Sequence, residues 1–311
     1  MIRARAILAG LTALLAQAPA AAQDATPHAS SRASSQASSQ ASSLVPDRAR
    51  LLMTAGVSTV EGASGGGLVP WAVIGGYGTK DSWGASAFET RVRTAEYALR
   101  SRGVAVGFRD RVEFSFADQS FDTRERGAAL GLGEGYTFEQ AVYGAKLRLF
   151  GRMVADQGTP LPQVTLGVTH KRNRNGAVLK LIGAGDDEGT EVSLRATKLM
   201  LARGLVLTGG LRYTNANQLG LLGFGGDAQP DRTVQVEASA AYLLSRTLAV
   251  GAELRTKPDN LGFARESDAW SAFAAWFPSK HLSVTGAYVD LGPIAGTEGE
   301  RGAYLSLQTG F

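Results

Sequence analysis

From residue 51 onward, apolar and polar residues alternate with a period of two. Val234, Val236 and Ala238, for example, alternate with Gln235 and Glu237. One face of each such segment is aliphatic, and the other carries glycine, small polar residues and charges. This pattern predicts β-strands with one apolar face. Alternation alone does not separate a soluble sandwich from a membrane barrel, because both present one apolar face per strand.

Polar connections of two lengths separate these segments. The short ones lie near residues 79–81, 109–110, 245–246 and 278–280, and the long ones cover 122–135, 173–189, 215–231, 257–267 and 291–301. Residues 151–162 form a longer connection where a short one is expected. Outer-membrane barrels alternate short periplasmic turns with longer extracellular loops. The spacing of the connections therefore favours a barrel.

Strand candidates begin near residues 52, 70, 82, 99, 111, 137, 163, 190, 204, 232, 247, 268, 282 and 302. The first two are the least regular, and without them twelve remain. Both counts are even, as in single-chain bacterial barrels. The sequence predicts an all-β fold, an antiparallel transmembrane β-barrel of about 12–14 strands of the bacterial outer-membrane type. Residues 51–311 form this single domain, in which 51–69 are either a hatch or the first strand.

The N-terminal residues have the features of an export signal. Arg3 and Arg5 precede an apolar stretch and a run of small residues, which predicts a signal peptide over residues 1–22. Residues 23–50 are rich in Ser, Ala and Gln and contain a short tandem repeat, which predicts a flexible tether. Together with the barrel pattern, these segments predict a location in the bacterial outer membrane with the tether in the periplasm.

Aromatic residues lie near the ends of the predicted strands. Trp270 and Trp276 share a face six residues apart, which spans about 20 Å at a rise of ~3.3 Å per residue. This distance approaches the apolar band of outer-membrane barrels, about 25 Å tall and flanked by aromatic girdles. The candidate girdle consists of Trp71, Tyr77, Tyr213, Tyr242, Trp270, Trp276 and Phe311.

The ends of the predicted strands also suggest partners. The last strand ends at Phe311, which resembles the C-terminal signal that the barrel assembly machinery reads. His170 lies at the predicted outer rim, followed by the basic residues Lys171, Arg172 and Arg174. We expect this rim to face phosphates of lipopolysaccharide, and the apolar face to contact outer-membrane lipid.

A set of charged residues falls on the polar face of the predicted strands. These candidate lumen-lining residues are Glu113, Lys146, Arg148, Arg195, Arg212, Glu237, Glu253 and Arg255. Basic residues outnumber acidic ones, so one interpretation is a polar channel with a slight preference for anions. The other is a lumen closed by ion pairs across the barrel. The sequence leaves both open.

Composition narrows the chemistry. The 311 residues include no cysteine and only 3 histidines, which excludes disulfide scaffolds, thiol catalysis and cysteine-ligated metals. We expect no cofactor and no metal site. The 32 basic and 28 acidic residues give a formal charge of +4, too balanced for a nucleic-acid partner. A lipid hydrolase built on His170 is the remaining enzymatic option, and we expect no enzymatic activity.

Five stretches resemble a proteobacterial family catalogued as domain of unknown function 3034. They cover residues 60–79, 217–227, 257–266, 275–283 and 287–292. The resemblance extends over nearly all of residues 51–311. It implies an outer-membrane-like barrel, and it implies no activity and no functional residues.

Three functions follow from these features. The first is a passive outer-membrane channel for small solutes, either polar ones or apolar ones that pass a hatch containing residues 63–67. The second is a structural barrel that displays surface loops such as residues 215–231 without transport. The third is a lipid-modifying outer-membrane enzyme.

Overall fold

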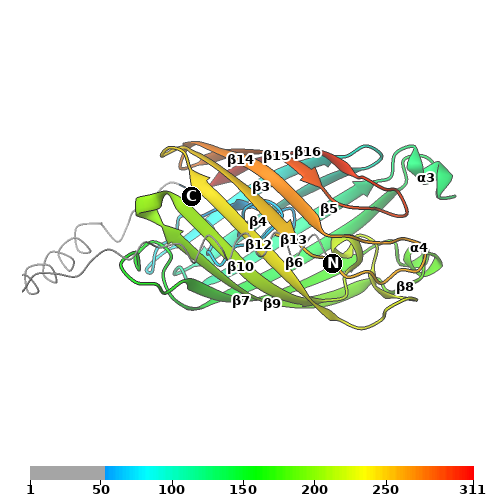
Figure 1. The fold of residues 1–311 in the computed structure, drawn as a ribbon, viewed down its shortest axis with the longest axis horizontal. Coiled ribbons are helices and arrows are strands. Elements are labelled where there is room, and N and C mark those ends of the chain that lie inside the picture. Colours follow the sequence, from blue (N-terminus) through cyan, green and yellow to red (C-terminus); the bar gives the residue numbers. More distant parts are fainter. Residues whose placement is uncertain (1–52) are drawn as a thin grey trace, which may run out of the picture. The chain divides into compact units, whose positions relative to one another are not determined.

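The computed structural model describes residues 53–311, so the predicted signal peptide and tether lie outside the described residues. Twelve antiparallel strands form a closed barrel (Figure 1). In chain order the wall strands are β3 (Trp83–Arg93), β4 (Ala98–Phe108), β5 (Val112–Asp122), β6 (Thr137–Phe150), β7 (Gln163–Asn173), β9 (Glu188–Met200), β10 (Leu205–Thr214), β12 (Thr233–Leu243), β13 (Leu248–Arg255), β14 (Ala269–Ser279), β15 (Leu282–Asp290) and β16 (Arg301–Gly310). Pairing of β16 with β3 closes the wall.

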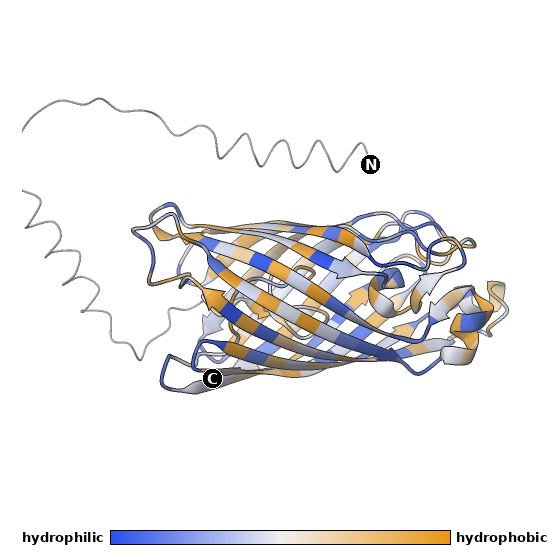
Figure 2. Ribbon diagram, turned by 90° about the horizontal axis from the view of Figure 1, so that it is seen from below, coloured by the Kyte–Doolittle hydropathy of each residue, from blue (hydrophilic) through white to orange (hydrophobic). Residues whose placement is uncertain are grey.

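The period-two pattern of the sequence separates the two faces of the wall. In β14, Trp270 and Trp276 point outward with 40% and 52% of their surface exposed, whereas Ser271 and Phe273 are buried inside. The same alternation of hydrophobic and hydrophilic residues is visible along the wall strands (Figure 2). Strand pairing satisfies the backbone polar groups of each strand, because every wall strand has two neighbours.

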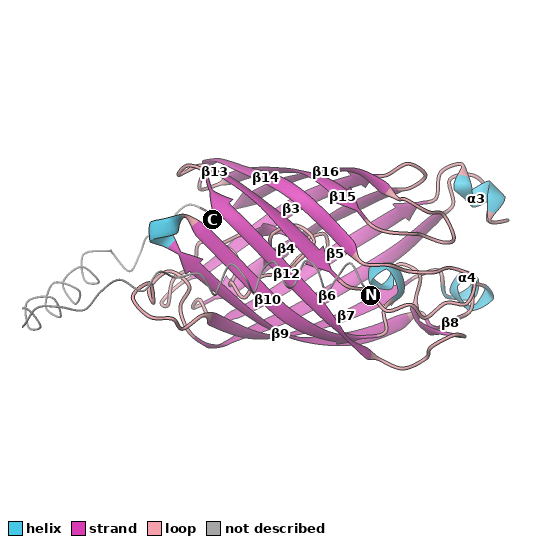
Figure 3. Cartoon of the chain, viewed as in Figure 1, coloured by secondary structure: helices cyan, strands magenta, loops and turns pink. Residues whose placement is uncertain are grey.

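The connections differ at the two ends of the barrel, as predicted. One end carries most of the short turns, the connection 151–162 and the short 3-10 helix η1 (Leu201–Arg203), and we call it the short-turn end. The other, the long-loop end, carries α3 (Arg126–Ala129), α4 (Gly176–Leu181), β8 (Ala184–Asp186), η2 (Asn217–Gly220) and β11 (Phe224–Gly226) (Figure 3). The short turn 94–97, between β3 and β4, also lies at the long-loop end. The C-terminus lies at the end opposite α3 and α4 (Figure 1). Within residues 53–311, no helix has the length and apolar character needed to cross a membrane.

Residues 53–78, the interior segment, lie inside the barrel and contribute no strand to its wall. Most of them are buried, and their only regular structure is a hairpin of β1 (Val57–Ser58) and β2 (Ser64–Gly65). The wall strands expected to begin near residues 52 and 70 are therefore wrong, and the structure has the lower of the two strand counts. The physical reason is the composition of the segment, which is rich in glycine, a residue that weakens strands.

The interior is layered along the barrel axis. On β9, Leu199 belongs to an apolar cluster at the short-turn end, while Arg195 and Glu191 follow toward the long-loop end. On β10 the order is the same, with Val206 in the apolar cluster and Arg212 near the far end of the strand. A second apolar cluster, which includes Tyr97 and Phe121, lies at the long-loop end. The polar residues of the lumen thus lie between two apolar layers.

Candidate functional site

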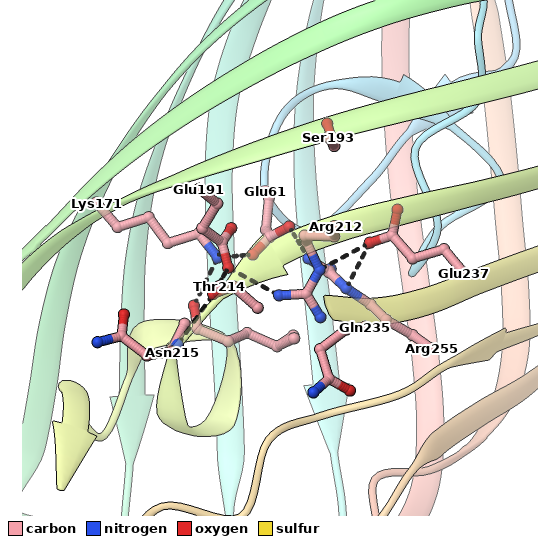
Figure 4. Close-up of polar contacts among 12 residues, drawn as sticks. Glu61, Lys171, Glu191, Ser193, Arg212, Thr214, Asn215, Gln235, Glu237 and Arg255 are labelled. Carbon is pink, nitrogen blue, oxygen red and sulfur yellow. Dashed lines mark hydrogen bonds and ion pairs between the residues drawn. The ribbon is translucent and has the colours of Figure 1, made fainter. Parts of the chain in front are cut away.

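Glu61 is the only charged residue of the interior segment. Its carboxylate pairs with Lys171 of β7 and lies 2.6 Å from a guanidinium nitrogen of Arg255 of β13. These two strands are not neighbours in the wall. All three side chains are at most 5% exposed. The ion pairs therefore join the segment to two separate parts of the barrel (Figure 4).

Further ion pairs extend from this contact along the wall. Lys171 lies 2.8 Å from Glu191, and Arg212 lies 2.7 Å from Glu191 and 3.0 Å from Glu237. Glu237 also lies 2.6 Å from Arg195 and 3.1 Å from Arg255. We call this set the charge network, and its members are Glu61, Lys171, Glu191, Arg195, Arg212, Glu237 and Arg255. Figure 4 labels all of them except Arg195.

Because the charge network is buried, its stability depends on every one of its members. Removing charges from water costs several kcal/mol per ion, and only close pairing with further hydrogen bonds offsets that cost. Thr214 of β10 supplies one such bond by donating to Glu191 at 2.6 Å. Without Glu61, four cations would face two carboxylates. The interior segment thus supplies a charge that the wall lacks.

A second anchor of the segment lies on β5 and β6. Glu113 accepts the backbone N–H groups of Ser64 at 3.1 Å and Gly75 at 2.7 Å. Lys146, 3.1 Å from Glu113, donates to the carbonyls of Ser64 and Val73. A Cβ on Gly75 would lie 2.1 Å from the hydroxyl of Ser64, so a larger residue would displace that side chain. The glycines of the segment allow its backbone to reach buried side chains.

Glu253 of β13 forms a third anchor. Its carboxylate accepts the backbone N–H groups of Leu68 at 2.8 Å and Val69 at 3.2 Å, and the hydroxyl of Ser271 at 3.2 Å. A Cβ on Gly66 would come within 2.3 Å of this carboxylate. The wall thus holds the segment largely through its backbone, in addition to the ion pairs of Glu61.

Residues 215–226, the mouth loop, fold into the barrel on the side of the charge network that faces the long-loop end. Lys171 donates to the carbonyl of Leu219 at 3.0 Å, and Asn173 donates to the carbonyl of Leu221 at 2.9 Å. Gln218 and Leu219 have positive φ angles of 42° and 63°, a conformation that is uncommon for residues other than glycine. Lys171 therefore contacts both the interior segment and the mouth loop.

A buried ion pair in the connection between β13 and β14 holds the mouth loop as well. Lys257 donates to the side-chain carbonyl of Gln218 at 3.0 Å, and Glu266 accepts the backbone N–H of Gln218 at 2.9 Å. Burial lowers the pKa of Lys257 and raises the pKa of Glu266, and their mutual attraction opposes both shifts. The mouth loop is thus fixed by charged groups on its two sides.

The structure brings most of the predicted lumen residues together. Seven are buried inside the barrel, and Arg148 lies at the short-turn end, where it pairs with Asp110. Sequence reasoning missed Glu61, Lys171 and Glu191. Lys171 was expected on an outer basic rim and is fully buried instead. The alternation along β7 is the signal that could have placed Lys171 inside the barrel. Lys171 lies on the same strand face as Asn173, which points inward.

The candidate girdle residues fall into two groups. Tyr213, Tyr242, Trp270, Trp276 and Phe311 are 40–57% exposed on the outer face. Trp71 is wrong as a girdle residue, since it is 6% exposed inside the barrel.

The indole N–H of Trp71 donates to the hydroxyl of Ser239 at 3.1 Å. Tyr77 is also not on a wall strand, and its backbone N–H donates to the carbonyl of Phe311 at 3.1 Å. Both misplacements have one cause. Residues 70–79 alternate as a strand does, yet they belong to the segment and its exit from the barrel.

These features define an antiparallel β-barrel of the outer-membrane type, closed by twelve strands and filled by its own N-terminal segment. The chain belongs to the family described as "Protein of unknown function (DUF3034)", whose model matches residues 54–308. The family resemblance seen in the sequence is thereby confirmed.

Several solved structures share the barrel architecture. The KdgM porin has a TM-score of 0.48 at 8% identity and covers 73% of this chain and 99% of that one. The COG4313 outer membrane channel from Pseudomonas putida F1 has a TM-score of 0.43 at 11% identity, with coverages of 78% and 96%. The Acinetobacter baumannii outer membrane protein Omp33 has a TM-score of 0.43 at 9% identity, with coverages of 74% and 98%. Likeness at this level concerns architecture alone. Comparison with curated proteins gives no match.

Proposed function

We propose that this protein is an outer-membrane channel whose interior segment closes the lumen, and that small solutes pass passively when the segment is displaced. The observation that carries the proposal is Glu61, the one charge of the segment, which completes the charge network of the wall. The proposal therefore combines the two interpretations of the lumen charges, with ion pairs in the closed state and a polar passage in the open state.

The outer face supports a location in the membrane. Large apolar side chains such as Val104, Leu194 and Leu305 are 47–59% exposed along the wall strands. Soluble proteins rarely leave such a contiguous apolar surface in water. Aromatic side chains lie toward both ends of this belt, with Tyr213 and Trp270 near the long-loop end and Tyr242 and Trp276 near the short-turn end. This arrangement matches the girdles of membrane barrels.

The inner face suits a passage that fills with water when the segment leaves. Hydroxyl side chains line the wall beside the segment, including Thr197, which accepts from the backbone N–H of Ala72 at 2.8 Å. Water would replace such contacts at little cost, because it both donates and accepts hydrogen bonds. The cations of the charge network would also be hydrated, so the open state is not penalised by unpaired buried charges.

Conduction requires the segment to move. The cavity beside the charge network, lined by Glu61, Lys146 and Arg195 among others, has a volume of about 20 Å³, about the space of a single water molecule. Moving the segment would separate Glu61 from Lys171 and Arg255. These ion pairs therefore oppose opening, together with the anchors at Glu113 and Glu253.

Single-channel recording from the refolded protein in a planar bilayer tests the proposal. We expect Glu61→Gln to open at least about tenfold more often than the unmodified protein, which corresponds to about 1.4 kcal/mol. The open lumen should prefer anions, because the wall contributes more cations than carboxylates to the charge network.

Glu89→Gln is the matched control, because Glu89 makes its ion pairs with Arg91 and Arg100 on the exposed outer face. It should leave the recordings unchanged. Migration on a denaturing gel with and without heating shows that each variant is folded. Silent bilayers with folded Glu61→Gln would reject the channel and favour a structural barrel.

A further inference from the structure

A cavity of about 370 Å³ opens at the long-loop end, and we call it the mouth pocket. Its walls include Tyr97, Phe121 and Phe138, its base includes Leu222 of the mouth loop, and loop residues such as Leu132 and Phe263 line it further. Ligand pockets of proteins usually measure about 300–1,000 Å³ and are mainly apolar. The mouth pocket thus has the size of a site for a small organic molecule.

The walls of the mouth pocket are fixed in place. The rings of Tyr97 and Phe121 stack with centroids 5.2 Å apart, and Phe121 and Phe138 are at most 4% exposed on inward positions of β5 and β6. The hydroxyl of Tyr97 donates to the carbonyl of Ile294 at 3.2 Å. Because this hydroxyl is bound by a loop, Tyr97 contributes its ring, and not its hydroxyl, to the wall of the pocket. Flat rings in fixed positions favour ligands that are themselves aromatic.

The entrance of the pocket is apolar and open to solvent. Leu181, the last residue of α4, lines the pocket and is 85% exposed, and Phe263 is 43% exposed. The charged lining residues are Lys180 and Asp227, one of each sign. Asp227 also accepts the backbone N–H of Gly262 at 2.7 Å. A rim without net charge does not select for an ionised ligand, so an uncharged one with a hydrogen-bonding group fits best.

We propose that the mouth pocket binds small, uncharged aromatic solutes that carry a hydroxyl or similar polar group. The site rests on its own geometry, and its role as the entry point for transport rests on the proposed function. Its base belongs to the mouth loop, whose Leu219 carbonyl accepts from Lys171. A solute in the pocket therefore contacts the same loop that Lys171 holds.

Binding of 2-naphthol to the full refolded barrel, measured by equilibrium dialysis against matched empty micelles, tests the site. Leu132→Trp fills the pocket and should weaken binding at least about tenfold, because the larger side chain takes the space of the ligand. Leu161→Trp is the matched control, since Leu161 is 43% exposed in the connection 151–162 at the opposite end. It should leave the affinity within about twofold, as expected for a residue away from the site.

Ile182→Trp, at a second lining position, replaces Leu132→Trp if that variant does not fold. Absence of saturable binding by the unmodified protein would overturn the site. Equal affinity in the unmodified protein and a folded filling variant would overturn it as well. Binding that the filling variants abolish, together with silent bilayers for Glu61→Gln, would leave the site standing and reject its role in transport.

Discussion

The polar middle of the barrel and its apolar ends hold the interior segment by different physical means. In the middle, Glu61 of the segment pairs with Arg255, which with Arg195 and Arg212 also contacts the carboxylate of Glu237. At the short-turn end, Met53, Val57 and Val73 of the segment pack against side chains of the wall. Ion pairs depend on a complete set of partners, whereas apolar contacts add up in proportion to the area buried. We infer that the middle fixes the position of the segment and that the ends stabilise it.

The largest effect is expected from removing the carboxylate that the three arginines share. Glu237→Gln leaves Arg195 without a buried anion, and loss of one partner from a buried pair typically costs about 3–5 kcal/mol. Urea unfolding of the barrel in lipid vesicles, followed by tryptophan fluorescence, measures this loss. Glu89→Gln, which removes exposed ion pairs, should cost at most about 1 kcal/mol. Equal losses in the two variants would contradict the distinction between middle and surface.

A smaller effect is expected in the apolar layer. Leu199 of β9 is 1% exposed in the short-turn cluster, and Leu199→Ala should lower the free energy of unfolding by about 2–3 kcal/mol through lost contacts and a cavity. The comparison on the same strand is Leu194→Ala, because Leu194 is 48% exposed on the outer face. That change should cost below about 1 kcal/mol. A larger loss at Leu194 would mean that the outer face, not the interior, supplies most of the stability.

The smallest effect concerns the hydrogen bond of the one tryptophan inside the barrel. Trp71→Phe keeps most of the apolar volume and removes the donor to Ser239, so it should cost about 1 kcal/mol. The loss should disappear when Ser239→Ala is introduced first, because the bond is then already absent. Independent losses in the double variant would show that Trp71 acts through packing alone.

The wall of the barrel was predictable from the sequence because its physics is local. Alternation decides which face of each strand points inward, and the long loops follow from polar runs between strands. The predicted connection 215–231 illustrates this, since it lies between β10 and β12 in the structure. The predicted strand starts agree with the observed ones for all twelve wall strands within two residues.

The interior was not predictable in the same way because its contacts join distant parts of the chain. Residues 70–79 alternate as a strand does, and no local signal assigns Trp71 to the interior. The role of Glu61 depends on its contacts with Lys171 and Arg255, which lie 110 and 194 residues away in the chain. Pairing across such separations depends on the closed barrel, which alternation alone does not specify.

The position of the interior segment has a consequence for the order in which the chain folds. Ser58 donates its backbone N–H to the side chain of Gln308 across 250 residues, and the carbonyl of Ser58 accepts from Tyr304. Both partners are on β16, the strand that also closes the wall against β3. Contacts between the two ends of a chain form late, because a long loop must be closed first. The segment is therefore enclosed only when the last strand arrives, and until then β3 keeps an unpaired edge of the kind that pairs with other chains.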